Sequence, residues 1–340
     1  MTLTQTRPVR SAQTKQYWGL GAAFGIGILV AIQSRVNGDL GQRLDDGIAA
    51  ALISFGTGLV MLLIACAVVP RVRGGLASVW RTIRNPPAGD PERGLRWWQC
   101  IGGLAGAFLV ATQSITVSVI GVAVFTVAVV AGQAATSLVV DRLGFGPAGP
   151  QPFTTLRVVG AIVAVLAVIL AVSDRLSHPA GLALAILPAI AGIGTAVQQA
   201  INGRVARTAS PDAYGAVTAA VINFTVGTTA LALVFAIDVF LRGAPRPLPT
   251  EPWLYVGGAC GVAFISLAAT VVRVVGVFVL GLGTIAGQLI ASLFIDLFVP
   301  AGDNPVTAPV VAGTLLALAA VVLAALPALR LAARIPSPSR

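Results

Sequence analysis

The chain has 340 residues, of which 56% are hydrophobic and only 10% charged, and its mean hydropathy is +0.91. A soluble domain carries about 25% charged residues, so this composition excludes a water-soluble globular protein and indicates an integral membrane protein. The net charge of +10 would suit nucleic-acid binding in a soluble protein. Here most basic residues stand between apolar stretches, where they act as signals of membrane orientation.

Ten apolar stretches are long enough for helices that cross a bilayer, which requires roughly 20 residues each. Their length without period-two alternation favours helices over a membrane β-barrel. Gly121 and Gly276 occupy the very short connections between the third and fourth and between the eighth and ninth stretches, so each of these pairs is expected to form a tight helical hairpin. The stretches cover residues 18–37, 48–69, 98–118, 120–140, 155–173, 181–201, 214–238, 254–272, 276–298 and 306–327.

The basic residues predict the orientation. Residues 1–17 form a polar, basic tail, and no small-residue cleavage site follows the first apolar stretch, so we interpret that stretch as a membrane helix and not as a signal peptide. With this tail in the cytoplasm, the inner segments hold most of the Lys and Arg, above all the predicted loop 70–97. The outer segments hold only Arg35, Arg43, Arg175, Arg242 and Arg246. Both termini, including the tail 329–340, are therefore predicted to be cytoplasmic.

The second half of the chain repeats motifs of the first. Gln33-x-x-x-Asn37-Gly38 recurs as Gln198-x-x-x-Asn202-Gly203, and Phe55-x-x-Gly58 recurs as Phe224-x-x-Gly227. The strongest match joins the fourth and ninth stretches, where five landmarks recur at one constant spacing: Gly121, Gly132, Gln133, Ser137 and Asp141, then Gly276, Gly287, Gln288, Ser292 and Asp296. Each half, residues 18–173 and 174–328, holds five stretches. Because five is odd, the second half enters the membrane from the opposite side, as in the inverted repeats of many secondary transporters.

Two amide pairs are candidate substrate ligands. Gln33 and Asn37 share one helix face, as do Gln198 and Asn202, because residues four apart lie above one another. Such groups could line a substrate cavity, or they could join neighbouring helices by hydrogen bonds in lipid. Their recurrence in both halves favours the cavity.

A second polar stripe also occurs in both halves. Gln133 and Ser137 precede Asp141, and Gln288 and Ser292 precede Asp296, at spacings that keep each trio on one helix face. We interpret the amides and hydroxyls as further substrate ligands. The carboxylates could take up protons or close two gates, an outer one between Asp296 and Arg35 or Arg43 and an inner one between Asp141 and Arg204 or Arg207. The alternative is that these charges only fix helix ends at the membrane interface.

Other chemistry is not indicated. No acidic residue stands in the middle of a stretch, so the substrate is expected to be neutral or zwitterionic, unless Asp141 and Asp296 provide the coupling. The sequence shows no catalytic set and no phosphate-binding GxxxxGK[ST] motif, and its three cysteines lack metal-ligand spacing. We therefore expect no enzyme, no cofactor and no metal.

On the Gln-x-x-x-Asn-Gly, Phe-x-x-Gly and Gly-Gln-x-x-x-Ser-x-x-x-Asp motifs, residues 18–328 resemble the drug/metabolite transporter superfamily, and more closely its YdcZ-like (EamA-like) branch. The resemblance implies a bacterial inner-membrane carrier with a central cavity between its halves. Small multidrug relatives carry a Glu in their first helix, which this chain lacks, so their proton-antiport mechanism is not carried over.

The sequence therefore predicts an all-α integral membrane protein with ten transmembrane helices in two inverted five-helix repeats. Its predicted function is secondary transport of a small polar organic molecule by alternating access, with export as the expected direction. The expected partners are this substrate and the lipid bilayer, without nucleic acid, and the protein could be a monomer or a homodimer. A non-transporting membrane scaffold or partner subunit is the main alternative, and a channel is the next.

Overall fold

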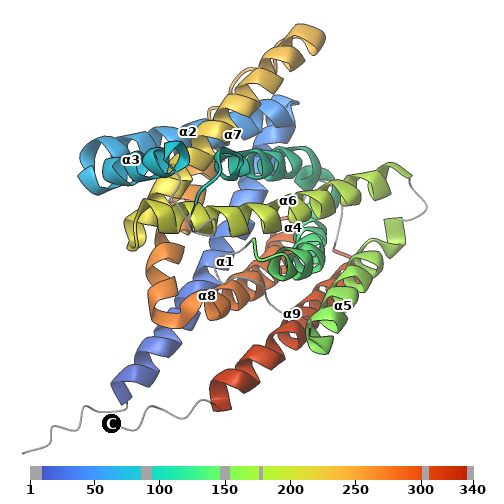
Figure 1. Cartoon of the computed structure of the whole chain (residues 1–340). Coiled ribbons are helices and arrows are strands. Elements are labelled where there is room, and N and C mark those ends of the chain that lie inside the picture. The colour runs from blue at the N-terminus through green and yellow to red at the C-terminus, as the bar shows by residue number, and fades with distance from the viewer. Residues whose placement is uncertain (1–9, 86–93, 146–153, 176–178, 301–305, 335–340) are drawn as a thin grey trace, which may run out of the picture.

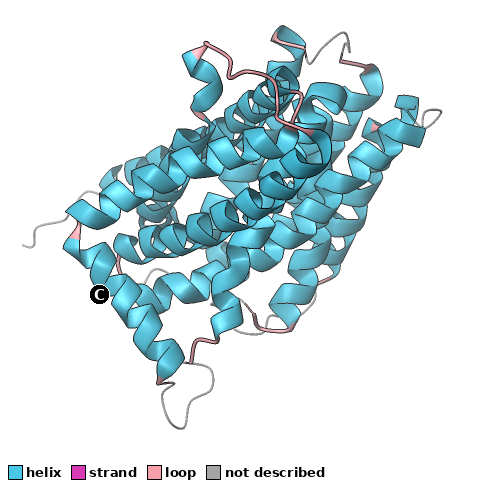
Figure 2. Cartoon of the chain, turned by 90° about the horizontal axis from the view of Figure 1, so that it is seen from above, coloured by secondary structure: helices cyan, strands magenta, loops and turns pink. Residues whose placement is uncertain are grey.

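The computed structural model describes residues 10–85, 94–145, 154–175, 179–300 and 306–334, and in these residues the chain is helical without a strand (Figures 1 and 2). The all-α prediction is confirmed. The α-helices are α1 (Arg10–Leu44), α2 (Gly47–Val68), α3 (Pro70–Arg84), α4 (Gly103–Arg142), α5 (Thr155–Ala171), α6 (Pro179–Ala209), α7 (Ala213–Arg242), α8 (Gly257–Phe298) and α9 (Ala308–Arg334). Three short 3-10 helices are η1 (Trp97–Gly102), η2 (Ser173–Arg175) and η3 (Pro252–Tyr255).

Six helices in the described residues are long and apolar enough to cross a membrane: Trp18–Leu44, Gly47–Val68, Trp97–Arg142, Leu184–Ala209, Ala213–Arg242 and Leu280–Phe298. Shorter apolar helices cover Thr155–Ala171, Gly257–Ala268 and Ala308–Ala324. Large apolar side chains such as Val68, Leu233 and Phe240 are exposed on the outside of the bundle. In lipid, apolar side chains can face the membrane as well as the protein interior, so the chain has the surface of a multi-pass membrane protein.

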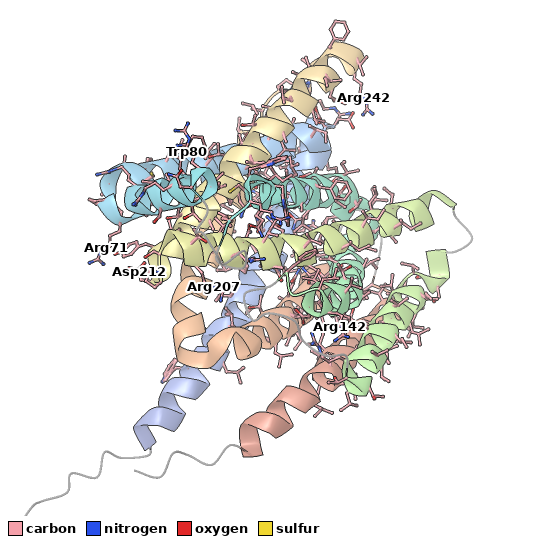
Figure 3. The ribbon with its side chains drawn as sticks, viewed as in Figure 1. Arg71, Trp80, Arg142, Arg207, Asp212 and Arg242 are labelled. Atoms are coloured by element: carbon pink, nitrogen blue, oxygen red, sulfur yellow. The ribbon has the colours of Figure 1, made fainter. Side chains whose placement is uncertain are left out.

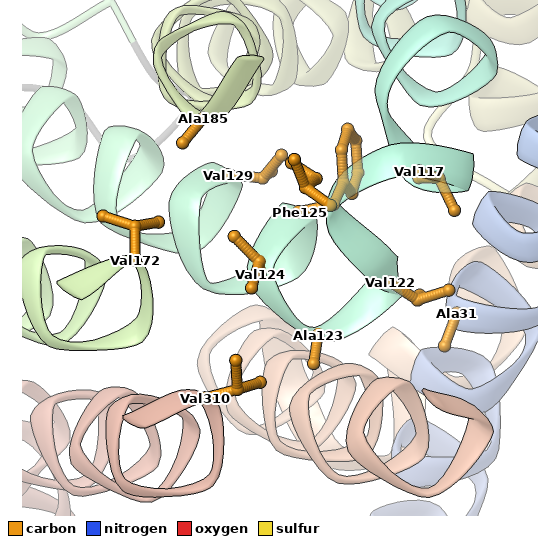
Figure 4. Close-up of a cluster of buried hydrophobic side chains, with 11 residues drawn as sticks. Ala31, Val117, Val122, Ala123, Val124, Phe125, Val129, Val172, Ala185 and Val310 are labelled. Carbon is orange, nitrogen blue, oxygen red and sulfur yellow. The ribbon is translucent and has the colours of Figure 1, made fainter. Parts of the chain in front are cut away.

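Helix α4 consists of two arms that reverse at Gly121, whose φ of 83° and ψ of 163° lie outside the helical region. Next to the first arm, Gly102 lies by Asn202 and Gly106 by Gln198, so this arm runs antiparallel to α6. The second arm runs parallel to α6, because Phe125 packs with Ala185 and Gly132 with Ile193. The reversal is enclosed by apolar side chains, including Val117, Val122 and Val124 (Figure 4). The predicted hairpin at Gly121 is thus present.

Helix α8 packs on α1 in the same way, with one part antiparallel and one part parallel to it. Gly257 lies by Asn37 and Gly261 by Gln33, so the first part of α8 is antiparallel to α1. Gly283 lies by Ala23, and Gln288 approaches Gly27, so the later part of α8 is parallel to α1. The chain therefore reverses between these parts, and the reversal is visible in the orange ribbon of Figure 1.

Close contacts made by one half of the chain recur in the other at equivalent positions. A Cβ added at Gly132 would lie 2.1 Å from the carbonyl oxygen of Ala189, and one at Gly287 would lie 2.1 Å from that of Phe24. Likewise, a Cβ at Gly103 would meet the oxygen of Asn223 at 2.1 Å, and one at Gly258 that of Ser54 at 2.3 Å. These positions correspond in the sequence repeat, so the repeat is expressed in equivalent packing of α4 on α6 and α7 and of α8 on α1 and α2.

The predicted loop 70–97 is wrong over its first half, where the chain forms α3. Pro70 stands in the first turn, where its missing N–H costs nothing. Val72, Gly75 and Val79 form the buried face at helical spacing, and the arginines stand on the other faces. Helices also enter the predicted tails, since α1 begins at Arg10 and α9 ends at Arg334, whereas residues 1–9 and 335–340 lie outside the described part.

Two neighbouring glycines of α1 provide a matched test of this packing. A Cβ at Gly27 would lie 2.1 Å from the oxygen of Thr284 and 2.5 Å from the nitrogen of Gln288, whereas one at Gly25 would meet nothing within 4 Å. We expect Gly27→Ala to destabilise the protein by about 1–3 kcal/mol, because two backbones must separate. Gly25→Ala should stay within about 1 kcal/mol of the wild type, since alanine favours helix.

The measurement is the melting temperature of both variants in the same detergent, followed by tryptophan fluorescence. Equal melting temperatures for Gly27→Ala and Gly25→Ala would contradict the close approach of α1 and α8.

Candidate functional site

Two phenylalanines from equivalent positions meet between the halves. Phe55 of α2 and Phe224 of α7 stack with their ring centroids 4.8 Å apart and their planes at 25°. A Cβ at Gly58 would lie 2.3 Å from Phe224, and one at Gly227 would lie 2.3 Å from Phe55, so each ring occupies the space above the glycine of the other motif. The repeated Phe-x-x-Gly motif therefore brings these rings together, because each glycine leaves room for the ring of the other motif.

The two repeated glutamines flank this pair. Gln33 and Phe224 border one glycine, since a Cβ at Gly261 would lie 3.2 Å from Nε2 of Gln33 and 3.3 Å from Cζ of Phe224. In the same way, a Cβ at Gly106 would lie 2.6 Å from Nε2 of Gln198 and 3.4 Å from Cζ of Phe55. Both glutamines are only half-buried.

The central group, as we call Gln33, Phe55, Gln198 and Phe224, thus combines two stacked rings with two amides, each of which can donate and accept hydrogen bonds. The recurrence of Gln-x-x-x-Asn-Gly in both halves had marked the glutamines as candidate ligands. The recurrence of Phe-x-x-Gly was also noted, but the stacking of its phenylalanines was not predicted.

The two predicted asparagines are in different surroundings. Asn37 is fully buried, and its Nδ2 donates to Oε1 of Gln113 at 2.8 Å. Gln113 donates in turn to Oγ of Ser34 at 2.9 Å, and the hydroxyl of Ser34 donates to the Val30 carbonyl at 2.9 Å. In this conformation Asn37 joins α1 to α4 by a hydrogen bond between helices, which is the alternative to lining a substrate cavity. Asn202 is half-buried beside Gly102, where its Oδ1 and that of Asn223 approach the same position.

The second polar stripe lies at helix interfaces. The hydroxyl of Ser137 donates to the Ala134 carbonyl at 3.0 Å, and that of Ser292 donates to the Leu289 carbonyl at 2.9 Å. Gln288 is buried against α1, and Gln133 is half-buried where α4 meets α6. The structure does not bring these four residues into the central group, and their role in binding stays a prediction.

Asp296 closes the reversal of α4. Its carboxylate accepts hydrogen bonds from the backbone N–H of Val122 at 2.9 Å and of Ala123 at 2.7 Å, and its residue is 6% exposed. These N–H groups begin the second arm of α4, where no carbonyl of the same helix can accept them and where the helix dipole favours a negative charge. A Cβ at Gly121 would lie 2.6 Å from Oδ2 of Asp296, so only glycine fits beneath the carboxylate.

The other predicted gate residues have partners of their own. Asp141 forms an ion pair with Arg157 of α5, and both side chains are partly exposed. Arg35 pairs with Asp39 at 3.0 Å, one turn further along α1. Arg43 pairs with Glu251, and Arg204 lies half-buried near the end of α6. These contacts differ from the pairs that the gate hypothesis named. Arg157 was missed because nothing in its sequence surroundings distinguishes it from an orienting charge.

Among the described residues, no three His, Cys, Asp or Glu side chains come together as a metal site requires.

Comparisons with known proteins concern the family and the fold of the chain. The family model described as "Putative inner membrane exporter, YdcZ" matches residues 18–170 and 183–323. No curated protein matches the chain. A solved structure described only as "Crystal structure of protein" has 18% sequence identity and a TM-score of 0.50, covering 94% of this chain and 99% of its own. This likeness concerns the fold alone.

The family match covers most of the chain, in two stretches that fall within the predicted halves. Together with the apolar helices, it identifies a multi-pass protein of the inner membrane. The chain belongs to the YdcZ family of drug/metabolite transporters, and at the level of that family it is a membrane transporter of the exporter type.

Proposed function

We propose that this protein is a secondary carrier that moves a small organic molecule out of the cell by alternating access. In this proposal ten membrane helices form two inverted five-helix repeats, α4 and α8 supply two helices each, and both termini are cytoplasmic. The substrate is neutral or zwitterionic, with an apolar face and with groups that form hydrogen bonds.

The observation that carries the proposal is the central group. It lies where the halves meet, and each half contributes one aromatic ring and one amide from equivalent positions. Binding sites for small molecules are mostly apolar with a few polar groups that fix orientation, which describes this combination. No charged side chain belongs to the group, and a charge without a partner is costly at membrane depth, so a substrate without net charge fits best.

Contacts at one end of the bundle support alternating access. At the proposed outer end α1 packs closely on α4, since a Cβ at Gly41 would lie 2.2 Å from the oxygen of Ser114, and Asp296 is bound to Val122 and Ala123. In this proposal these contacts close the outer end, and the carrier must break them to open it.

The two aspartates then serve as alternating locks. Asp296 holds the reversal of α4 in this conformation, while its counterpart Asp141 is kept by Arg157. In the opposite conformation Asp296 leaves α4, and Asp141 leaves Arg157 to accept N–H groups that follow Gly276. The gate is therefore made between a carboxylate and a helix start, and the predicted pairing of carboxylate with arginine at the other helix is not needed.

Substrate binding should depend on Gln198. In a thermal-shift screen of the purified protein against several hundred neutral and zwitterionic metabolites, a ligand present at 100 times its Kd stabilises the folded state by about 2.7 kcal/mol. Gln198→Ala removes hydrogen bonds from the site and should weaken a true ligand roughly 10-fold, by about 1.5 kcal/mol. Gln199→Ala is the matched control, because Gln199 is the exposed neighbour on the same helix.

A ligand whose thermal shift is reduced equally in both variants, or in neither, does not occupy the central group. For a confirmed ligand, counterflow in proteoliposomes separates a carrier from a channel. Ligands without any flux would favour the scaffold.

The alternating locks predict opposite effects of Asp296→Asn and Asp141→Asn. Asparagine at 296 loses one hydrogen bond to a charged group, about 1.5–3 kcal/mol, so the ratio of outer-closed to outer-open protein should fall roughly 10- to 100-fold. The reporter is Gln33→Cys in a chain whose Cys66, Cys100 and Cys260 are changed to alanine, labelled in intact cells by a membrane-impermeant maleimide. Asp296→Asn should accelerate labelling, and Asp141→Asn should slow it.

Asp238→Asn is the control, because Asp238 forms an ion pair with the exposed Arg242 one turn away. Unchanged labelling in Asp296→Asn, with an unchanged amount of folded protein, would rule out the lock.

A further inference from the structure

Helix α3 is the one described helix of this chain whose two faces differ sharply in polarity. Its buried face packs on α6 and α7: Val79 lies in a cluster with Val205 and Ala219, and a Cβ at Gly75 would lie 2.5 Å from the Thr218 hydroxyl. Its outward face carries four exposed arginines and one tryptophan, namely Arg71, Arg73, Trp80, Arg81 and Arg84. The helix contains no acidic residue.

The arginines keep donors that face outward. Arg84 stacks over the ring of Trp80 at 4.5 Å, so the two form one unit on the exposed face. Arg81 uses Nε for the Ala77 carbonyl at 3.3 Å, and Arg73 uses Nη1 for the carbonyls of Cys66 and Ala67. A guanidinium has five N–H donors, so within the described residues the terminal nitrogens of Arg81 and Nη2 of Arg73 are not used by a protein acceptor.

Among the described residues at this end of the bundle, the acidic Asp212 lies beside Arg71 in Figure 3. Its carboxylate accepts from the Ser210 hydroxyl at 2.7 Å and from the Tyr214 N–H at 3.0 Å, where it begins α7. Arg71 itself lies 5.3 Å from the centre of the Tyr214 ring. The positive charge of Arg81 and Arg84, at the other end of α3, has no acidic side chain of α3 beside it.

Helix α3 lies at the level where the membrane-spanning helices begin and end. It crosses α6 and α7 near Ala209 and Thr218, and the apolar spans of these helices end at Ala209 and begin at Ala213. Exposed tryptophans also mark the starts of two other spans, Trp18 and Trp97. Tryptophan prefers the membrane–water interface, so the exposed Trp80 belongs to the same level.

We propose that α3 is an interfacial helix that binds the headgroups of anionic phospholipids in the leaflet on its side of the membrane, with Trp80 inserted and Arg81 and Arg84 on the phosphates. The proposal does not depend on the transported substrate or on alternating access. Guanidinium groups bind phosphate in a bidentate manner, and arginines close to the membrane surface attract anionic lipids.

The test adds phosphatidylglycerol or phosphatidylcholine to the full-length protein in neutral detergent and follows the melting temperature. Phosphatidylglycerol should raise it and phosphatidylcholine should not. The double variant Arg81→Gln/Arg84→Gln should bind phosphatidylglycerol roughly 30-fold more weakly, at a contribution near fivefold per arginine. Arg242→Gln is the control, because Arg242 is an equally exposed arginine at the opposite end of α7 (Figure 3) and should leave the response unchanged.

Three results would overturn the proposal: an equal response to both lipids, an unchanged response in the double variant, or the same effect from soluble glycerol phosphate, which would indicate a plain anion site. Should the double variant fail to fold, a second measurement decides. Brominated phosphatidylglycerol should quench the wild type more than Trp80→Phe, and brominated phosphatidylcholine should quench both alike. Equal quenching of the two proteins by the anionic lipid would reject the insertion of Trp80.

Discussion

Contact between backbones at glycines is the constraint on which the rest of the structure depends. In lipid, apolar surface is not driven together by water, so helices are held by close packing and by hydrogen bonds. Gly27 and Gly287 let α1 and α8 approach until a methyl group would no longer fit, and Gly132 and Gly192 do the same for α4 and α6. These two pairs are the most extensively packed helix pairs in the described residues.

The buried reversal of α4 creates a second constraint. At Gly121 it leaves N–H groups among buried apolar side chains, and an unsatisfied buried group costs several kcal/mol, on the order of a hydrogen bond lost in an apolar medium. Asp296 satisfies them from the other half of the chain. The cost of the break thus becomes a specific attraction between the halves, and a transporter that must open at this point can do so only by finding another partner for both the N–H groups and the carboxylate.

Hydropathy predicted most of the helices, and the very short connection at Gly121 predicted the reversal of α4, because both follow from local sequence. Helix α3 was missed because its arginines lower the hydropathy, whereas its buried face is visible only as the spacing of Val72, Gly75 and Val79. The different surroundings of Gln33 and Asn37 could not be predicted either. They depend on Gln113, which the fold brings to Asn37 from a distant part of the sequence. The backbone partners of Asp296 could not be predicted for a related reason, since a backbone N–H carries no sequence signature.

The two halves are equivalent in packing but not in polarity, and this difference bears on the resting state of a carrier. Gln113 links α4 to Asn37 and Ser34 of α1 at the proposed outer end. In the sequence repeat, the counterparts of Gln113 and Ser34 are Ala268 and Gln199, and alanine cannot form the equivalent bonds. Each net hydrogen bond contributes roughly 1 kcal/mol, so closing the outer end gains two bonds that closing the inner end does not. In the proposed alternating cycle the two end states therefore differ in free energy, and the substrate must supply the difference when it favours the outward-open form.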